Sequence, residues 1–285
     1  MEYGITLKMI LQQQQTWAIN NSIDIDKTGE RSAYTHYLAE NLFYDTLSVQ
    51  TVDEYSAGQG RELQTHMRAL HSSSALLVNV FEYWRQTHRV SEIADIFGAS
   101  EGITTMEFEK KHKISNLGTP HLDIELSGEY VKPFAIEAKY TEPYGTKTQR
   151  NGTNLDKYLK QNALWEGLPN LKELAQEILG QESKKTSWRH LDVPQLIKHV
   201  LGLSYCYKPD GFTLLYLWFN TETDEAQEHL KEIQLFNERI KADVTFKNMT
   251  YQELFTKIKH LANVNPNYLE YLKKRYFDFI FNVVA

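Results

Sequence analysis

Two neighbouring segments of the chain, residues 120–126 and 133–140, alternate between apolar and polar side chains. A period of two is typical of a strand with one buried face. The apolar residues of each segment share one face of the strand and are Leu122, Ile124, Leu126, Phe134, Ile136, Ala138 and Tyr140. Gly128 and Glu129 lie between the segments and favour a turn. The sequence therefore predicts a β-hairpin with one face against the core.

The polar face of this hairpin gathers two carboxylates and one ammonium group. Paired as expected, the strands bring Asp123 near Glu137, with Lys139 one pleat further along. Hard cations such as Mg2+ prefer oxygen ligands, and carboxylates with water and substrate phosphate complete their shell. A bound cation activates water and stabilises charge on a phosphoryl oxygen, and a neighbouring lysine can position or deprotonate that water. These residues predict metal-assisted phosphodiester hydrolysis; the alternative is an exposed hairpin whose charged face is only solvated.

The same residues resemble the motif of the PD-(D/E)XK nuclease superfamily, which has a restriction-endonuclease-like fold. The motif corresponds here to Pro120-His-Leu-Asp123 and Glu137-Ala-Lys139, with two residues between the proline and Asp123. The resemblance implies a Mg2+-dependent DNA endonuclease in which Mn2+ can substitute. It also implies a metal held by Asp123, Glu137 and the backbone carbonyl of Ala138, with Lys139 beside the attacking water.

Two further acidic residues are candidate metal ligands. Residues 103–110 predict the first strand, and Glu109 near its end could supply a third acidic group; a solvated strand charge explains it equally well. Glu82 lies in segment 72–84, which predicts a buried helix with a serine N-cap. The superfamily often carries a glutamate on the helix before its first strand, so the resemblance implies this role for Glu82. Pairing with a nearby arginine is the alternative.

A second helix, predicted over residues 187–202, carries two candidate supporting residues. Pro194 suits its first turn. Gln195 and His199 stand four residues apart and so share one face. Some superfamily nucleases place a Gln-x-x-x-Tyr pair near the metal on this helix, and His199 stands where that pair has tyrosine. A surface glutamine and an ordinary hydrogen-bonded histidine are the alternative.

Basic residues on both sides of the hairpin are candidate DNA contacts. Lys111 and Lys113 belong to the densest basic run, and Lys147 and Arg150 lie in the excursion after Tyr140. Lysine and arginine side chains bind phosphates, although solvated loops are the competing explanation. The formal net charge of −6 disfavours tight nonspecific DNA binding, but local patches rather than totals set phosphate contacts.

The order of predicted elements between Ser72 and Phe219 is helix, three strands, helix, strand. We expect an α/β fold with a mixed central β-sheet flanked by helices, a restriction-endonuclease-like αβββαβ core and added helices at both ends. The near-continuous apolar run 212–219 predicts a strand covered on both faces. The predicted organisation is an N-terminal helical arm (1–57), a nuclease core (58–220) with an insertion (141–187), and a C-terminal helical extension (221–285).

Composition sets further limits. The 285 residues are 41% apolar, enough for a sizeable core, and the single cysteine, Cys206, excludes an internal disulfide and favours a reducing cytoplasm. No apolar run approaches the ~18 residues of a membrane span, and the N-terminal residues are not those of a signal peptide. Lys273, Lys274 and Arg275 suggest a solvated helix face.

The expected partners are DNA and, because duplex cleavage needs two active sites, a second copy of the chain. A companion methyltransferase cannot be read from the sequence. Two alternatives remain: a catalytically silent nucleic-acid-binding or scaffold protein of the same fold, and an unrelated partner-binding helical protein with a chance motif.

Overall fold

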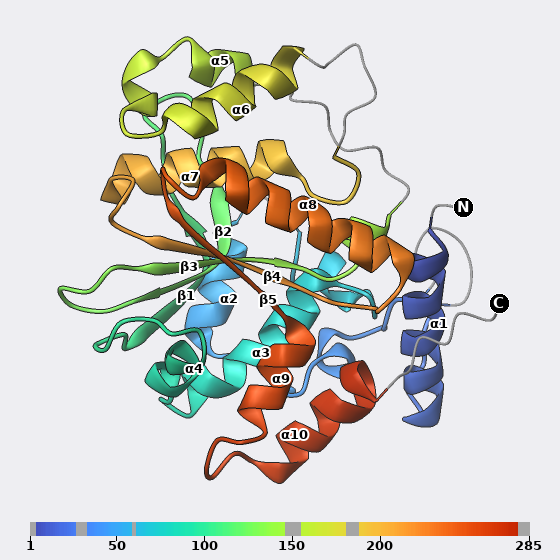
Figure 1. Ribbon diagram of the computed structural model, residues 1–285. Helices are drawn as coiled ribbons and strands as arrows, with labels where there is room; N and C mark the ends of the chain where they lie inside the picture. Colours follow the sequence, from blue (N-terminus) through green and yellow to red (C-terminus); the bar gives the residue numbers. More distant parts are fainter. Residues whose placement is uncertain (1–3, 27–32, 59–60, 146–154, 181–187, 279–285) are drawn as a thin grey trace.

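The protein is described by a computed structural model covering residues 4–26, 33–58, 61–145, 155–180 and 188–278. A five-stranded mixed β-sheet lies between layers of helices (Figure 1), which confirms the predicted α/β class. The strands are β1 (Thr105–Lys111), β2 (His121–Ser127), β3 (Phe134–Lys139), β4 (Thr213–Trp218) and β5 (Thr245–Thr250). The α-helices are α1 (Ile5–Asn20), α2 (Val49–Ser56), α3 (Ser73–Gln86), α4 (Val90–Ile96), α5 (Leu155–Leu159), α6 (Pro169–Gly180), α7 (Val193–Tyr207), α8 (Asp224–Ile240), α9 (Tyr251–Ile258) and α10 (Pro266–Leu272).

The strands are ordered β1-β2-β3-β4-β5 across the sheet. The first three form an antiparallel meander, whereas β4 runs parallel to β3 and β5 runs parallel to β4. Parallel neighbours need a crossover connection, which α7 supplies between β3 and β4 and α8 supplies between β4 and β5. The predicted order of core elements is confirmed, with α4 added before β1 and with α5 and α6 added before α7.

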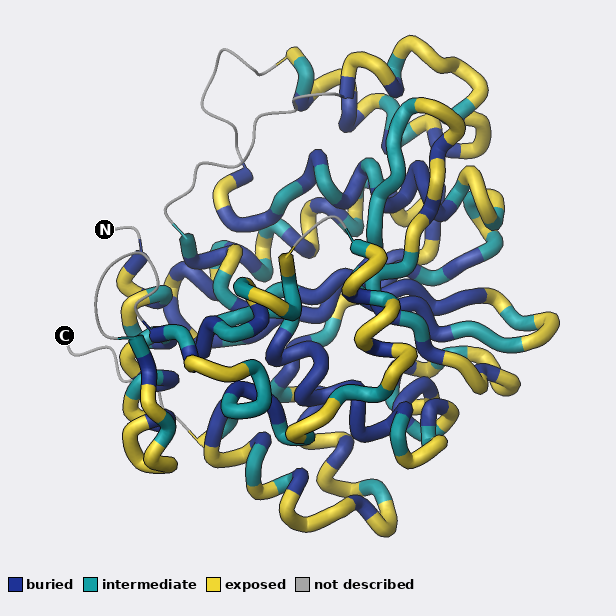
Figure 2. Tube along the Cα trace, turned by 180° about the vertical axis from the view of Figure 1, so that it is seen from behind, coloured by how far each residue is buried: buried dark blue, intermediate teal, exposed yellow. Residues whose placement is uncertain are grey.

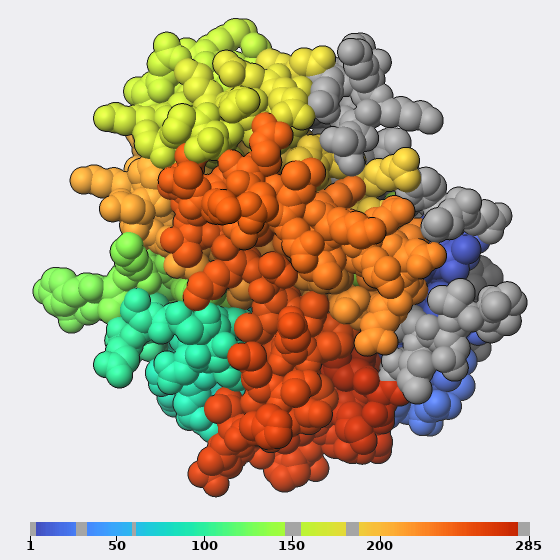
Figure 3. Space-filling model, viewed as in Figure 1, coloured from blue at the N-terminus to red at the C-terminus, as the bar shows by residue number. Residues whose placement is uncertain are grey.

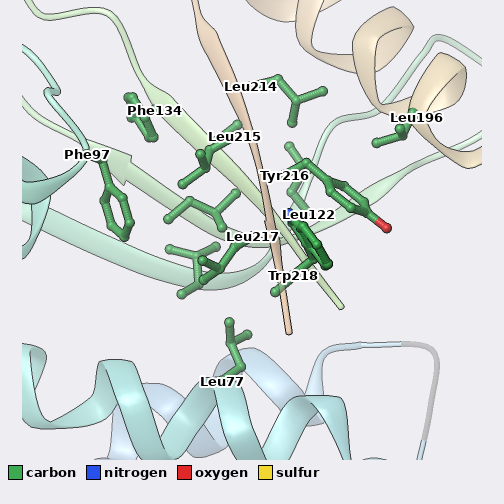
Figure 4. Packing of buried hydrophobic residues seen from close by; sticks show 14 of the residues in the cluster. Leu77, Phe97, Leu122, Phe134, Leu196, Leu214, Leu215, Tyr216, Leu217 and Trp218 are labelled. Carbon is green, nitrogen blue, oxygen red and sulfur yellow. The ribbon is translucent and has the colours of Figure 1, made fainter. Parts of the chain in front are cut away.

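The helices cover both faces of the sheet. Helices α7 and α8 lie over one face, and α3, α4 and α9 lie over the other (Figure 1). Alternation along β4 serves both layers: Leu214 points toward Leu196 of α7, and Leu217 points toward Leu77 of α3 (Figure 4). Five of the six β4 residues are buried, as expected for an interior strand. The burial-coloured trace shows the sheet as the dark centre of the molecule (Figure 2).

The tip of the β2–β3 hairpin projects from the body of the protein, at the left in Figure 3. Tyr130 at this tip is 97% exposed and has a left-handed backbone with φ of 63°. The turn begins at Gly128, where a Cβ atom would lie 1.8 Å from the carbonyl oxygen of Gly102. Only glycine fits this close backbone approach, which brings the end of β2 against the segment that leads into β1.

The C-terminal basic triplet departs from the predicted solvated face. Lys273 and Lys274 are half-exposed or more, but Arg275 is fully buried. The reason is a π-helical turn at Lys273–Phe277, because its wider winding changes the direction of the following side chains. The Arg275 guanidinium donates to Asn41 O at 2.7 Å and lies 4.2 Å above the Trp17 ring of α1. This arginine therefore ties the C-terminal helices to the N-terminal segment.

Within the described ranges, none of the helices combines the length and the apolar character needed to cross a bilayer.

Candidate metal centre

Strands β2 and β3, which carry the predicted catalytic residues, stop pairing next to Asp123 and Glu137. The ladder between β2 and β3 runs from the pair Leu126 and Phe134 to the pair Ile124 and Ile136. At the next position the side chain of Asp123 takes part instead, because its Oδ2 accepts a hydrogen bond from Ala138 N at 2.7 Å. This bond brings the Asp123 carboxylate to the part of β3 that carries Glu137 and Lys139.

The carbonyl of Ala138 faces the same gap. Successive residues of a strand direct their N–H and C=O groups to opposite sides. Lys139 O accepts from Phe219 N at 3.0 Å on the β4 side. Ala138 therefore directs both of its backbone groups toward β2, where its N–H meets Asp123. The Asp123 carboxylate and the Ala138 carbonyl thus lie where the two strands separate, with Glu137 adjacent to Ala138 in the chain.

Glu137 lies at the centre of this group and is only 1% exposed. Its Oε1 accepts a hydrogen bond from Lys139 Nζ at 2.5 Å. Its Oε2 lies 3.2 Å from His199 Nε2 of α7, which is within ion-pair distance. Within the described residues, Glu137 Oε2 is a buried oxygen without a hydrogen-bond partner. Such atoms are rare in proteins and point to a missing ion or water.

The charges of the site are strongly coupled. Burial opposes ionisation of Glu137, but Lys139 and His199 outweigh it and lower the pKa of this carboxyl. Burial raises the pKa of Asp123 well above its usual value, and the negative charges of Glu137 and Glu109 act in the same direction. Burial alone would lower the pKa of Lys139, yet Glu137 and Asp123 raise it. In the metal-free protein, Lys139 is therefore an ammonium and Asp123 tends to hold a proton.

Glu109 of β1 lies beside Asp123. The β1–β2 ladder pairs Phe108 with Ile124 and Lys110 with Leu122, so Glu109 stands across from Asp123. Its backbone is left-handed, with φ of 52°, an uncommon conformation for a non-glycine residue in a strand. Burial raises its pKa to about 7, and the charges of Glu62 and Glu137 contribute. Strained backbone and a raised carboxyl pKa together are typical of a functional site.

Replacement of Glu109 by glutamine is expected to stabilise the metal-free protein at pH 8 but not at pH 5. The folded-state pKa of about 7 lies above the ordinary value of 4.5, so the stability tied to the bound proton is complete below 4.5 and is lost as the pH rises through 7. The shift corresponds to an upper bound of about 3 kcal/mol at pH 8. Urea unfolding in EDTA at both pH values measures this difference. An equal effect at both pH values would show that Glu109 ionises normally.

Both carboxylate oxygens of Glu82 accept hydrogen bonds from residues outside this group. It is buried on α3, and its carboxylate accepts hydrogen bonds from Ser48 N at 2.8 Å, Thr51 Oγ1 at 2.6 Å and Gln86 Nε2 at 2.9 Å. These bonds hold the first turn of α2 against α3. The structure therefore corrects the suggestion that Glu82 is a metal ligand: both of its oxygens already serve this helix contact.

The two candidates on α7, Gln195 and His199, lie in different environments. His199 is 3% exposed and reaches Glu137, as described above. Gln195 is half-buried, and its backbone N–H is capped by Asp192 Oδ1 at 2.9 Å. In the described part of the chain the Gln195 side chain makes no hydrogen bond, so α7 delivers the histidine rather than the glutamine to the site.

The candidate DNA contacts are only partly described. Lys111 and Lys113 are exposed at the end of β1, and Lys111 Nζ donates to the carbonyl oxygen of Ala57. Between them His112 is buried, with its Nε2 2.8 Å from Glu125 Oε2, so the basic run is not a simple solvated loop. Lys147 and Arg150 lie outside the described residues.

A hollow of about 340 Å³ along β1 is lined by Asp53, Glu54, Ala57, Glu107, Phe108, Glu109, Lys110 and Lys111.

Sequence reasoning missed two tyrosines near the site. Tyr55 of α2 and Tyr251 of α9 are buried, and their hydroxyls have no hydrogen-bond partner among the described residues. Burial raises the pKa of both, and the charge of Asp123 contributes to each. No local signal marks them, because both belong to helices outside the motif and reach the site only through tertiary packing.

The residues present fit a hard divalent cation. Among the described residues, no three His, Cys, Asp or Glu side chains gather into a cage that could hold a metal by itself. The chain offers instead the carboxylates of Asp123 and Glu137 and the carbonyl of Ala138. Few protein ligands, with the remaining positions left to water and substrate phosphate, are typical of Mg2+. Glu137 Oε2, which has no hydrogen-bond partner among the described residues, and the clustering of three carboxyl groups (Asp123, Glu137 and Glu109) support a cation at this place.

Residues 11–277 match a protein family described as Restriction Endonuclease associating with ARP. The chain belongs to this family. The match spans almost the whole sequence and agrees with the resemblance to the PD-(D/E)XK superfamily and with the fold. Neither a curated protein nor a solved structure matches the chain. For a member of a restriction endonuclease family, the group at the split between β2 and β3 is the natural candidate for a nuclease centre.

Proposed function

We propose that this protein is a Mg2+-dependent endonuclease that hydrolyses phosphodiester bonds in DNA. The observation that carries the proposal is the meeting of Asp123, Glu137 and Lys139 where β2 and β3 separate. Membership of the restriction endonuclease family supports the nuclease class. The proposed metal ligands are Asp123, Glu137 and the Ala138 carbonyl, with Glu109 as a further acidic group and Mn2+ as an alternative ion.

The charges of the site explain why a cation is needed. When Asp123 and Glu137 are both ionised they outweigh Lys139, and Glu109 adds to the negative charge when it ionises. In this ionised state the group would repel a phosphodiester unless a cation were bound. When bound, the ion supplies Lewis-acid stabilisation of the charge that develops on the phosphate.

The protein's own residues order the proposed ligands and position the water and the phosphate. Asp123 is fixed by its bond to Ala138 N, and Glu137 by its bond to Lys139, so the ligands are ordered before the ion arrives. We propose that Lys139 Nζ donates to a phosphate oxygen and orients the attacking water. Its side chain is 13% exposed, so the ammonium reaches the opening without being freely solvated.

The proposed substrate surface flanks this opening. Lys111 and Lys113 lie at the end of β1, next to the strand position of Glu109, and we propose that they contact DNA phosphates together with Lys147 and Arg150. Cutting both strands of a duplex requires two such centres, so we also propose a homodimer. The family description adds an association with ARP, which we propose for this chain as well. The single cysteine agrees with a cytoplasmic location, which is part of the same proposal.

We expect the purified protein to nick or cut plasmid DNA in the presence of Mg2+ and to lose this activity in EDTA. The assay compares supercoiled, linear, single-stranded and methylated DNA with several divalent ions, because the sequence leaves the preferred form open. DNA binding without cleavage under every condition would indicate a catalytically silent member of the fold. The absence of both DNA binding and DNA cleavage would contradict the proposal.

A further inference from the structure

We propose that His199 is a nitrogen ligand of the metal centre and that it makes the site prefer Mn2+ to Mg2+. This inference rests on the proposed function, because it takes Glu137 to be a metal ligand. It adds a ligand from α7, an element that lies outside the two catalytic strands.

The distance between the two side chains suits one shared ion. His199 Nε2 and Glu137 Oε2 are 3.2 Å apart. Two ligands at right angles on an ion, each about 2.1–2.2 Å from it, are separated by about 3.0–3.1 Å. The two atoms are within ion-pair distance, yet in the described residues both lack a hydrogen-bond partner. One ion shared by the two atoms would account for both observations.

The position of His199 is fixed by packing. The imidazole is 3% exposed, and a buried polar side chain normally has a hydrogen-bond partner. One turn further along α7, a Cβ atom on Gly202 would lie 2.6 Å from Pro120 Cγ and 3.0 Å from His112 Cβ. The absence of a side chain at Gly202 lets α7 approach the start of β2 closely. This approach holds the imidazole against Glu137 without a bond of its own.

The chemistry of imidazole determines which ion benefits. Mg2+ prefers oxygen ligands and gives up water reluctantly, whereas first-row transition metals accept imidazole nitrogen readily. Oxygen ligands from Asp123, Glu137 and Ala138 suit both classes of ion. His199 therefore adds binding energy for Mn2+ that Mg2+ does not gain.

The competing explanation is an ion pair in which a protonated His199 neutralises Glu137. The two explanations predict opposite effects of removing the imidazole. A lost ligand weakens Mn2+ binding and leaves Mg2+ binding nearly unchanged. A lost positive charge strengthens the binding of both ions, because it removes a competitor for the Glu137 carboxylate.

The experiment measures Mn2+ and Mg2+ binding to the full chain by calorimetry, with wild type, His199→Phe and His190→Phe compared. His190 is a matched control, since it is also buried but bonds to Pro143 O and lies 3.4 Å from Glu228. We expect Mn2+ affinity to fall about tenfold or more in His199→Phe, Mg2+ affinity to change less than about threefold, and His190→Phe to resemble wild type. Equal or tighter binding of Mn2+ by His199→Phe would overturn the inference.

In a second readout, the deciding result comes from the wild-type protein. Electron spin echo spectroscopy of Mn2+ bound to the wild-type protein should show coupling to a 14N nucleus, and this coupling should disappear in His199→Phe. No 14N coupling in the wild type would also overturn the inference. Failure of the proposed function is recognised separately: in that case Asp123→Ala binds both ions as the wild type does, or the wild type binds neither.

Discussion

Replacement of Lys139 by methionine is expected to lower Mg2+-dependent DNA cleavage by about 10³-fold or more while Mg2+ remains bound. Lys139 Nζ lies 2.5 Å from Glu137 Oε1, beside the proposed position of the phosphate. Methionine keeps most of the volume of the side chain but cannot donate a proton or stabilise negative charge. Because the substitution also removes a cation, Mg2+ affinity should stay the same or increase. Plasmid cleavage under single-turnover conditions and calorimetric Mg2+ titration separate the two effects.

A suitable control for this variant is Lys241→Met. Lys241 is 60% exposed on its side chain and pairs with Glu238 at the end of α8, far in sequence from the motif. It should cleave DNA at the wild-type rate. Equal cleavage by Lys139→Met and wild type, measured side by side, would remove Lys139 from the mechanism.

The largest effect on stability is expected at Arg275. Its guanidinium is fully buried and donates to Asn41 O, to Tyr271 OH and to Gln14 Oε1. Arg275→Met leaves these acceptors without their donor and removes the stacking on Trp17. Each unsatisfied buried polar group is costly, so we expect the free energy of unfolding to fall by about 3–5 kcal/mol. Urea denaturation followed by tryptophan fluorescence measures the change.

Lys274→Met tests whether the effect is specific to the buried arginine. Lys274 immediately precedes Arg275, and its side chain is 62% exposed. Its Nζ lies 3.1 Å from Glu270 Oε1. Such an exposed pair contributes at most about 1 kcal/mol. If Arg275→Met were no more destabilising than Lys274→Met, the bridge between the C-terminal helices and α1 would be unimportant for stability.

The β2–β3 hairpin could be predicted because its signal is local. The period of two in segments 120–126 and 133–140 fixes which side chains share a face, and the turn residues make the two strands neighbours. These two facts are sufficient to bring Asp123 to Glu137 and Lys139. The hydrogen bond from Ala138 N to Asp123 could not be predicted, because it depends on where the ladder ends.

Residues whose environment depends on distant segments were harder to place. A carboxylate in an apolar helix looks the same in sequence whether it binds a metal or tethers another helix, and Glu82 proved to hold α2. Arg275 resembles its solvated neighbours until the π-helical turn directs it inward. Tyr55 and Tyr251 reach the site from helices that are remote from the motif in sequence. In each case the deciding contact is tertiary, and the local pattern does not contain it.

Calorimetric titration of the wild-type protein and of Asp123→Ala with Mg2+ tests the central claim most directly. Asp123 is proposed to share one cation with Glu137, and alanine removes its carboxylate together with the bond from Ala138 N. We predict that the wild type binds Mg2+ and that Asp123→Ala does not bind it measurably, while Glu82→Gln binds it as the wild type does. Mg2+ binding that is unchanged in Asp123→Ala would show that the split between β2 and β3 is not a metal centre.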